Sequence, residues 1–134
     1  MNITQRVAAL DLPAGKFVII GSGILDALGL REAMDIDLVL ESALFEELRA
    51  SGEWVEQQKH DELVLYSPNG DAEAWLSWGS EGKPNFDDLY NGSMVIGGVH
   101  FTSPERTIIE KQKMNRPKDI ADIALLEAYI RTHS

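Results

Sequence analysis

Two short groups of residues in the first third of the chain have the types and spacing that phosphate and metal chemistry requires. The first is Gly21-Ser22-Gly23, which follows the apolar run 17–20. Backbone amides at a glycine-rich turn between a strand and a helix form a concavity that binds anions, and a serine hydroxyl there can donate to a phosphate oxygen. Gly21 and Ser22 are therefore candidate phosphate-binding residues. Ser22 also suits the simpler role of helix N-cap.

The second group is the acidic pair Asp35 and Asp37, at the head of the apolar run 36–40. Residues i and i+2 of a strand point to the same face, so the two carboxylates would lie side by side. Such a pair is unfavourable at a half-buried position unless a cation lies between the charges. The pair therefore predicts a site for Mg²⁺ or Mn²⁺, which bind carboxylate and phosphate oxygens. In the structural alternative, one aspartate ends the strand and the other pairs with Arg31.

A third acid, Glu73, lies on the predicted strand 72–76, whose other residues are apolar. On a strand beside Asp35 and Asp37 it would complete a two-metal cluster, in which one ion activates a hydroxyl and the other holds the leaving phosphates. Asp35, Asp37 and Glu73 are thus both candidate metal ligands and candidate catalytic residues. The alternative is that Glu73 points to the solvated face of the sheet.

Positive charge is concentrated near the C-terminus. Five of the 12 Lys and Arg residues fall between Arg106 and Lys118. Lys111, Arg116 and Lys118 are candidates for neutralising phosphate charge, and Asp119 could orient one of these cations through an ion pair. The alternative is a plain solvated helix surface.

The elements that must position these residues alternate along the chain. Apolar and β-branched runs predict strands at 16–20, 36–40, 54–56, 62–66, 72–76, 94–96 and 99–101. Helical spacing and capping residues predict helices at 1–11, 23–28, after a Ser42 cap up to Gly52, 86–90, 104–114 and 118–132. This order predicts an α/β (α+β) fold with a mixed central sheet flanked by helices, two of them C-terminal.

Composition narrows the class of protein. The chain has 134 residues and 44% apolar residues, so we expect a single domain over residues 1–134. Its net charge of −10 argues against a broad basic face for nucleic acid. The absence of cysteine excludes thiolate metal sites. We see neither a secretory signal nor an apolar run of about 20 residues, so we expect a cytoplasmic protein that does not enter a membrane.

Two motifs in this chain resemble those of a known family. Gly21-Ser22, twelve further residues and then the run 35–39 resemble the signature of the nucleotidyltransferase superfamily, which has the DNA polymerase β-like fold. The C-terminal run from Lys111 through 116–119 to Asp122 resembles the tail of small bacterial nucleotidyltransferase-like proteins. The resemblance spans roughly residues 17–130.

The resemblance implies transfer of a nucleoside monophosphate from a nucleoside triphosphate (NTP) to a hydroxyl. In that case Gly21 and Ser22 would hold the triphosphate, and Asp35 and Asp37 would bind Mg²⁺. Glu73 would be the third acid, a position where many members have aspartate. The acceptor would be a protein, an RNA or a small molecule, held by a partner protein or bound in the open cleft.

An alternative function is a non-catalytic module of the same fold that acts through partner binding, in an antitoxin-like or regulatory role. Four aromatic residues would then form an interaction surface: Trp75, Trp78, Phe86 and Tyr90. Aromatic residues at such positions more often belong to the core. The two hypotheses differ in geometry. Convergence of Glu73 with the aspartates beside the Gly-Ser turn favours the enzyme, and a Glu73 that points away favours the module.

Overall fold

A computed structural model describes residues 1–79 and 82–133. Its helices are α1 (Ile3–Ala8), α2 (Gly23–Ala27), α3 (Ser42–Ser51), α4 (Phe86–Tyr90), α5 (Pro104–Met114) and α6 (Pro117–His133). Its strands are β1 (Phe17–Ile20), β2 (Ile36–Leu40), β3 (Val55–Lys59), β4 (Glu62–Tyr66), β5 (Ala72–Trp75), β6 (Met94–Ile96) and β7 (Val99–Phe101).

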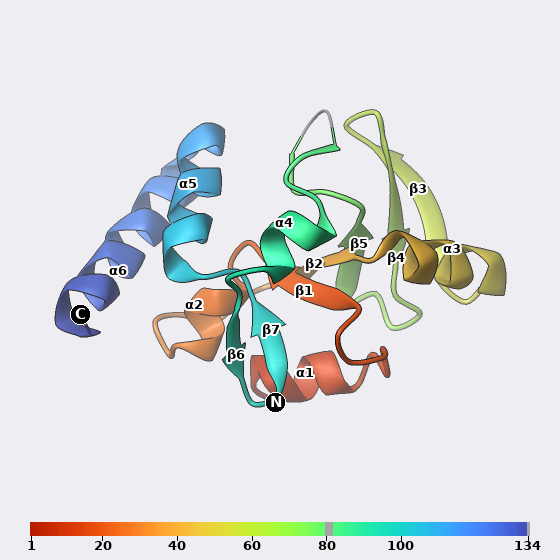
Figure 1. The fold of residues 1–134 in the computed structure, drawn as a ribbon, viewed down its shortest axis with the longest axis horizontal. Helices are drawn as coiled ribbons and strands as arrows, with labels where there is room; N and C mark the ends of the chain where they lie inside the picture. Colours follow the sequence, from red (N-terminus) through yellow and green to blue (C-terminus); the bar gives the residue numbers. More distant parts are fainter. Residues whose placement is uncertain (80–81, 134) are drawn as a thin grey trace.

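The strands form one mixed seven-stranded sheet in the order β3-β4-β5-β2-β1-β7-β6. β1 lies antiparallel to β2 and parallel to β7, while β2 lies parallel to β5. The outer pairs β3–β4, β4–β5 and β6–β7 are antiparallel. Figure 1 shows α5 and α6 together at one end of this sheet and α3 at the other. The predicted mixed sheet with flanking and C-terminal helices is confirmed.

Each face of the central sheet is packed against its own apolar cluster. Alternate residues of β1 show the division, because Phe17 and Ile19 belong to the larger cluster whereas Val18 and Ile20 belong to the smaller one. The larger cluster also takes buried side chains from α1, α2, α3 and α6. The smaller cluster is completed by Leu89 of α4. A strand covered on both faces reads as a continuous apolar run, which is why β1 could be recognised in the sequence.

Six elements have the predicted bounds, four differ by one residue at one or both ends, and three differ in other respects. The first helix is shorter than 1–11, because Asn2 and Gln5 form a capping box that starts it at Ile3. Ser42 is the first residue of α3 rather than its cap, and Glu41 occupies the N-cap position. The strand predicted at 54–56 extends to Lys59.

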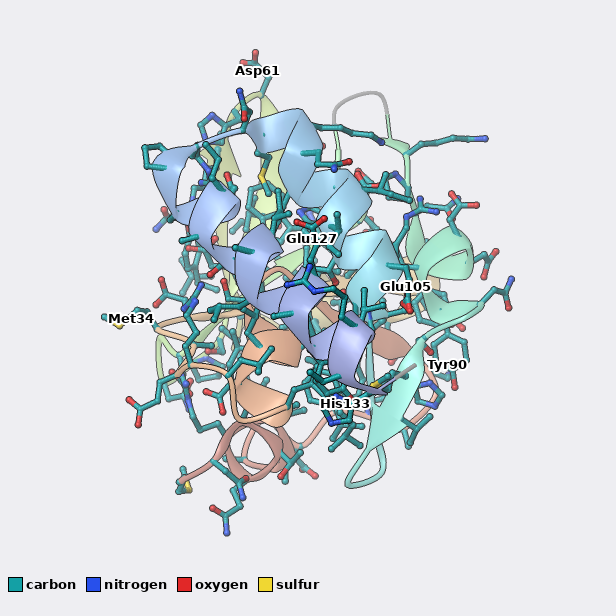
Figure 2. The ribbon with its side chains drawn as sticks, turned by 90° about the vertical axis from the view of Figure 1, so that its left-hand side faces the viewer. Met34, Asp61, Tyr90, Glu105, Glu127 and His133 are labelled. Atoms are coloured by element: carbon teal, nitrogen blue, oxygen red, sulfur yellow. The ribbon has the colours of Figure 1, made fainter. Side chains whose placement is uncertain are left out.

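The two C-terminal helices lie side by side, as Figure 2 shows from their own side of the molecule. Ser103 caps α5 by accepting a hydrogen bond from the backbone N–H of Arg106, and Pro104 occupies the first turn. Asn115, in the left-handed conformation, ends α5 and turns the chain into α6. Among the described residues, no helix has the length and apolar content needed to cross a membrane.

Candidate functional site

The strand register places Asp37 directly beside Glu73. β2 and β5 run parallel, and these two residues are partners in their pairing. Ile36 and Leu38 are fully buried in the larger cluster, so Asp37 lies on the opposite face of the sheet. Asp35 immediately precedes β2 and is exposed. The third acid therefore lies on the strand next to the aspartate pair, as predicted.

A cleft of about 470 Å³ opens over this part of the sheet. All eight site residues predicted from the sequence line it: Gly21, Ser22, Asp35, Asp37, Glu73, Lys111, Arg116 and Lys118. Further walls come from Lys59, His60, Glu62, Trp75 and Trp78. Gly21 and Lys118, which are 97 positions apart in the chain, thus line the same cleft. Glu73 points into the cleft instead of away from it.

Gly21 and Gly23, on either side of Ser22, are required for different physical reasons. Gly21 has a φ of +66°, and a Cβ there would lie 3.5 Å from Oδ2 of Asp37. Gly23 packs so closely on β1 that a Cβ would lie 2.3 Å from Cγ2 of Ile19. Gly21 therefore brings the turn against the Asp37 carboxylate, whereas Gly23 lets α2 lie close to the sheet.

Ser22 is the N-cap residue of α2, as predicted, but its side chain does not cap the helix. It occupies the N-cap position with helical backbone angles, and its side chain makes no capping hydrogen bond. Its hydroxyl accepts a hydrogen bond from Nη2 of Arg31 and lies 3.4 Å from Oδ2 of Asp122. Since α2 has only five residues, its helix dipole adds little to anion binding at this turn.

Asp37 is a cleft residue whose carboxyl group has a strongly shifted pKa. Burial, followed by the negative charges of Glu73 and Asp35, raises the pKa of Asp37 to about 6. The positive charges of Lys59 and Lys118 act in the opposite direction and do not compensate. A cation bound next to Asp37 would therefore favour the charged form of this carboxylate.

The carboxylates of Asp35 and Asp37 are suited to binding a divalent cation. Mg²⁺ is commonly held by one or two carboxylates together with substrate phosphates and waters, and Asp35 and Asp37 offer that donor set. Glu73 is differently engaged, because Nζ of Lys59 lies 3.1 Å and 3.3 Å from its two oxygens. Within residues 1–79 and 82–133, no group of three or more acidic or histidine side chains is arranged to hold a metal ion.

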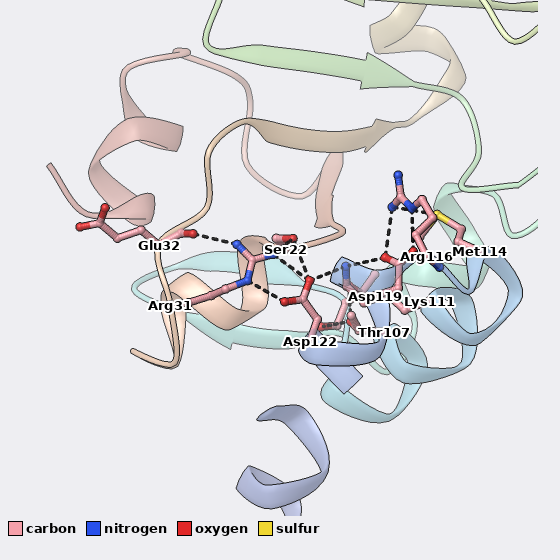
Figure 3. A network of polar contacts seen from close by, with 10 residues as sticks. Ser22, Arg31, Glu32, Thr107, Lys111, Met114, Arg116, Asp119 and Asp122 are labelled. Atoms are coloured by element: carbon pink, nitrogen blue, oxygen red, sulfur yellow. Dashed lines mark hydrogen bonds and ion pairs between the residues drawn. The ribbon is translucent and has the colours of Figure 1, made fainter. Parts of the chain in front are cut away.

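A buried network of charges joins the Gly-Ser turn to the C-terminal helices (Figure 3). Arg31 donates from Nε and Nη2 to the two oxygens of Asp122, at 2.6 and 2.7 Å. Nζ of Lys111 lies 2.9 Å from Asp122 and 3.4 Å from Asp119. The side chains of Lys111, Asp119 and Asp122 are at most 3% exposed. This network fixes α5 and α6 against the turn, so it positions one wall of the cleft.

The network shows which ion-pair partners Arg31 and Asp119 have, which the sequence left open. Arg31 pairs with Asp122, so the alternative in which it pairs with an aspartate of the acidic pair is wrong. Asp119 accepts hydrogen bonds from the side chain and backbone N–H of Arg116 and pairs with Lys111. The predicted ion pairing of Asp119 with one of these cations is therefore confirmed.

The two candidate lysines differ in availability. The charge of Lys111 is neutralised by two buried carboxylates, which corrects the expectation that this side chain is free to meet a phosphate. Lys118 is exposed, lines the cleft and acts electrostatically on Asp37. We therefore expect Lys118, rather than Lys111, to approach a bound phosphate.

The four aromatic residues of the alternative hypothesis are half-buried and pack against the core on the α4 face. Trp75, Trp78, Phe86 and Tyr90 all pack on the smaller apolar cluster. The rings of Phe86 and Tyr90 also contact each other in a tilted arrangement, with centroids 5.0 Å apart. These side chains are thus occupied by packing on Val18, Ile20, Val39 and Leu89 and do not form a separate exposed patch.

Lys59 is the site residue that sequence reasoning missed. It lies at the end of an exposed strand whose pattern is polar, and nothing in its local sequence distinguishes it from a surface lysine. Only the pairing of β3, β4 and β5 brings it to Glu73.

Three comparisons set the chain against known proteins. No protein-family model and no curated protein matches it. Among solved structures, it is similar to an antigenic nucleotidyltransferase-like protein from Paracoccidioides brasiliensis. The TM-score is 0.49 at 20% sequence identity, over 92% of this chain and 71% of that one.

Proposed function

We propose that this chain is a metal-dependent nucleotidyltransferase that binds an NTP in the cleft over β2 and β5. The observation that carries the proposal is the meeting of Gly21, Asp35 and Asp37 in a single cleft that also contains exposed Lys118. Two carboxylates in a cleft repel a triphosphate unless a cation lies between them, so the acidic pair suits a metal-bound nucleotide and not a free one.

The roles of the residues follow from their positions. Asp35 and Asp37 would hold Mg²⁺ or Mn²⁺, which when bound neutralises phosphate charge and makes a coordinated hydroxyl more acidic. Gly21 leaves room for a phosphate beside Asp37, because its missing side chain would point at that carboxylate. Lys118 would offset the charge that develops on the leaving pyrophosphate.

In the proposed reaction, an oxygen of the acceptor hydroxyl attacks the α-phosphorus of the NTP. The new P–O bond forms as the bond between the α-phosphorus and the bridging oxygen breaks, the hydroxyl proton is released, and pyrophosphate leaves. Catalysis of this kind depends mainly on positioning and electrostatic stabilisation. The network around Asp122 supplies rigidity by fixing Ser22 and the helix that carries Lys118.

A screen of the four NTPs tests nucleotide binding directly. Each NTP is added with Mg²⁺ or Mn²⁺, and the unfolding temperature is measured by differential scanning fluorimetry. A ligand that binds only the folded state raises this temperature, so at least one metal-nucleotide pair should stabilise the protein while the same NTP with EDTA should not. No stabilisation by any pair, at nucleotide concentrations up to several millimolar, would contradict the proposal.

A further inference from the structure

Lys59 brings a positive charge to Glu73, the cleft carboxylate on the strand next to the aspartate pair. Its side chain extends from the end of β3 past β4 to Glu73 on β5. There the ammonium group meets both carboxylate oxygens, at 3.1 and 3.3 Å. It also lies 5.8 Å from the ring centroid of Trp75, a distance at which a cation interacts with an aromatic face.

This ion pair is accessible to solvent and therefore exchangeable. The side chain of Lys59 is 40% exposed, and that of Glu73 is 18% exposed. Ion pairs with this exposure contribute little to the free energy of folding, because water competes for both partners. The ammonium group can thus leave Glu73 without unfolding the sheet around it.

The position of Lys59 in the sheet lets its charge influence the binding of a metal ion in the cleft. Asp37 and Glu73 are register partners, and the charge of Lys59 acts on both of them. Two positive groups that share neighbouring carboxylates repel each other, so the ammonium ion opposes a divalent cation in the same cleft.

Building on the proposed function, we propose that Lys59 is a built-in counter-ion of Glu73 that competes with divalent metal for this carboxylate. With Lys59 in place, the cleft binds metal through Asp35 and Asp37, and Glu73 does not act as a ligand. Without Lys59, Glu73 joins the donor set. The residue therefore sets how tightly, and through how many carboxylates, the cleft binds metal.

Mn²⁺ titration without nucleotide tests this inference independently of catalysis. Free Mn²⁺ is followed by electron paramagnetic resonance for the unmodified protein and for Lys59→Met, Lys59→Arg and Lys16→Met. Lys59→Met should bind Mn²⁺ about tenfold more tightly, because a like charge has been removed from the cleft. Lys59→Arg keeps the charge and should resemble the unmodified protein. So should Lys16→Met, which removes an exposed lysine from outside the cleft.

The outcomes separate this inference from the proposed function. Equal Mn²⁺ affinity of the unmodified protein and Lys59→Met overturns the role of Lys59 and leaves the metal site standing. Binding by Lys59→Met alone supports the competition and contradicts metal use by the natural chain. Absence of binding by both overturns both. Circular dichroism of each variant establishes that the fold is retained.

Discussion

Asp37 and Glu73 lie opposite each other on two parallel strands, and this relationship sets the electrostatics of the cleft. An acid on the interior of a sheet is already poorly solvated, and a second acid on the adjoining strand adds repulsion. The pKa of Asp37 is accordingly raised to about 6 by burial first and by Glu73 second. In the folded protein without metal, the charged form of Asp37 is therefore unfavourable at neutral pH.

The first prediction concerns the stability of Asp37→Asn. Because the pKa of Asp37 is higher in the folded state than in the unfolded one, its contribution to stability falls as pH rises from about 4 through about 6. Replacing it with neutral asparagine should raise the free energy of unfolding of the metal-free protein at pH 7.5 by about 2 kcal/mol. At pH 3.5 the difference should vanish. Urea unfolding at both pH values measures it.

A matched control for this prediction is Glu32→Gln, which removes an exposed acid that does not line the cleft. It should change the free energy of unfolding at pH 7.5 by less than about 0.5 kcal/mol. A loss of stability in Asp37→Asn at pH 7.5 would show that the Asp37 carboxylate is stabilised by contacts, and would contradict the repulsion described above.

The second prediction concerns the buried lysine of the network. Lys111→Met leaves the carboxylates of Asp119 and Asp122 without one of their cations in a buried position. Removing one member of a buried ion pair typically destabilises a protein by about 3 kcal/mol, and we expect a loss of that size here. Lys113→Met is the control, because Lys113 is 64% exposed and its pair with Glu110 should contribute less than about 1 kcal/mol. Equal losses in the two variants would mean that Lys111 does not hold the helices together.

The third prediction separates backbone strain from a role in binding. Gly21→Ala and Gly29→Ala both place a side chain at positive φ, which costs about 1 kcal/mol in each case. Only the methyl group at position 21 lies near Asp37, since nothing lies within 4 Å of a Cβ at Gly29. Gly21→Ala should therefore weaken binding of the metal-nucleotide pair, whereas Gly29→Ala should leave it unchanged. Isothermal calorimetry of both variants checks this, and similar affinities would contradict the placement of a phosphate at Gly21.

Much of the fold follows from local signals in the sequence. The bounds of α5 match the prediction at both ends, because Ser103 and Pro104 start the helix and Asn115 ends it. The strand β2 matches as well, since its apolar run is covered on both faces and bounded by polar residues. These are effects of residues a few positions apart, which a sequence displays directly.

The parts that could not be predicted depend on contacts between distant segments. The hydroxyl of Ser22 is bound by Arg31 and Asp122, and the latter is 100 positions away. A serine at the start of a helix looks like a cap unless that partner is known. Lys59 was missed for the same reason, because it meets Glu73 only after three strands have paired. Motif spacing thus indicated which residues line the cleft, but not which of them form hydrogen bonds and ion pairs with one another.

The most direct test of the account is calorimetric titration of the unmodified protein and Asp37→Asn with the NTP that stabilises the protein best. In Mg²⁺ the unmodified protein should bind it, and in EDTA it should not. Asp37→Asn, shown to be folded by its unfolding curve, should lose at least about tenfold in affinity, equivalent to 1.4 kcal/mol. Binding that is equal in Mg²⁺ and EDTA, or unaffected by Asp37→Asn, would contradict a metal-nucleotide site in this cleft.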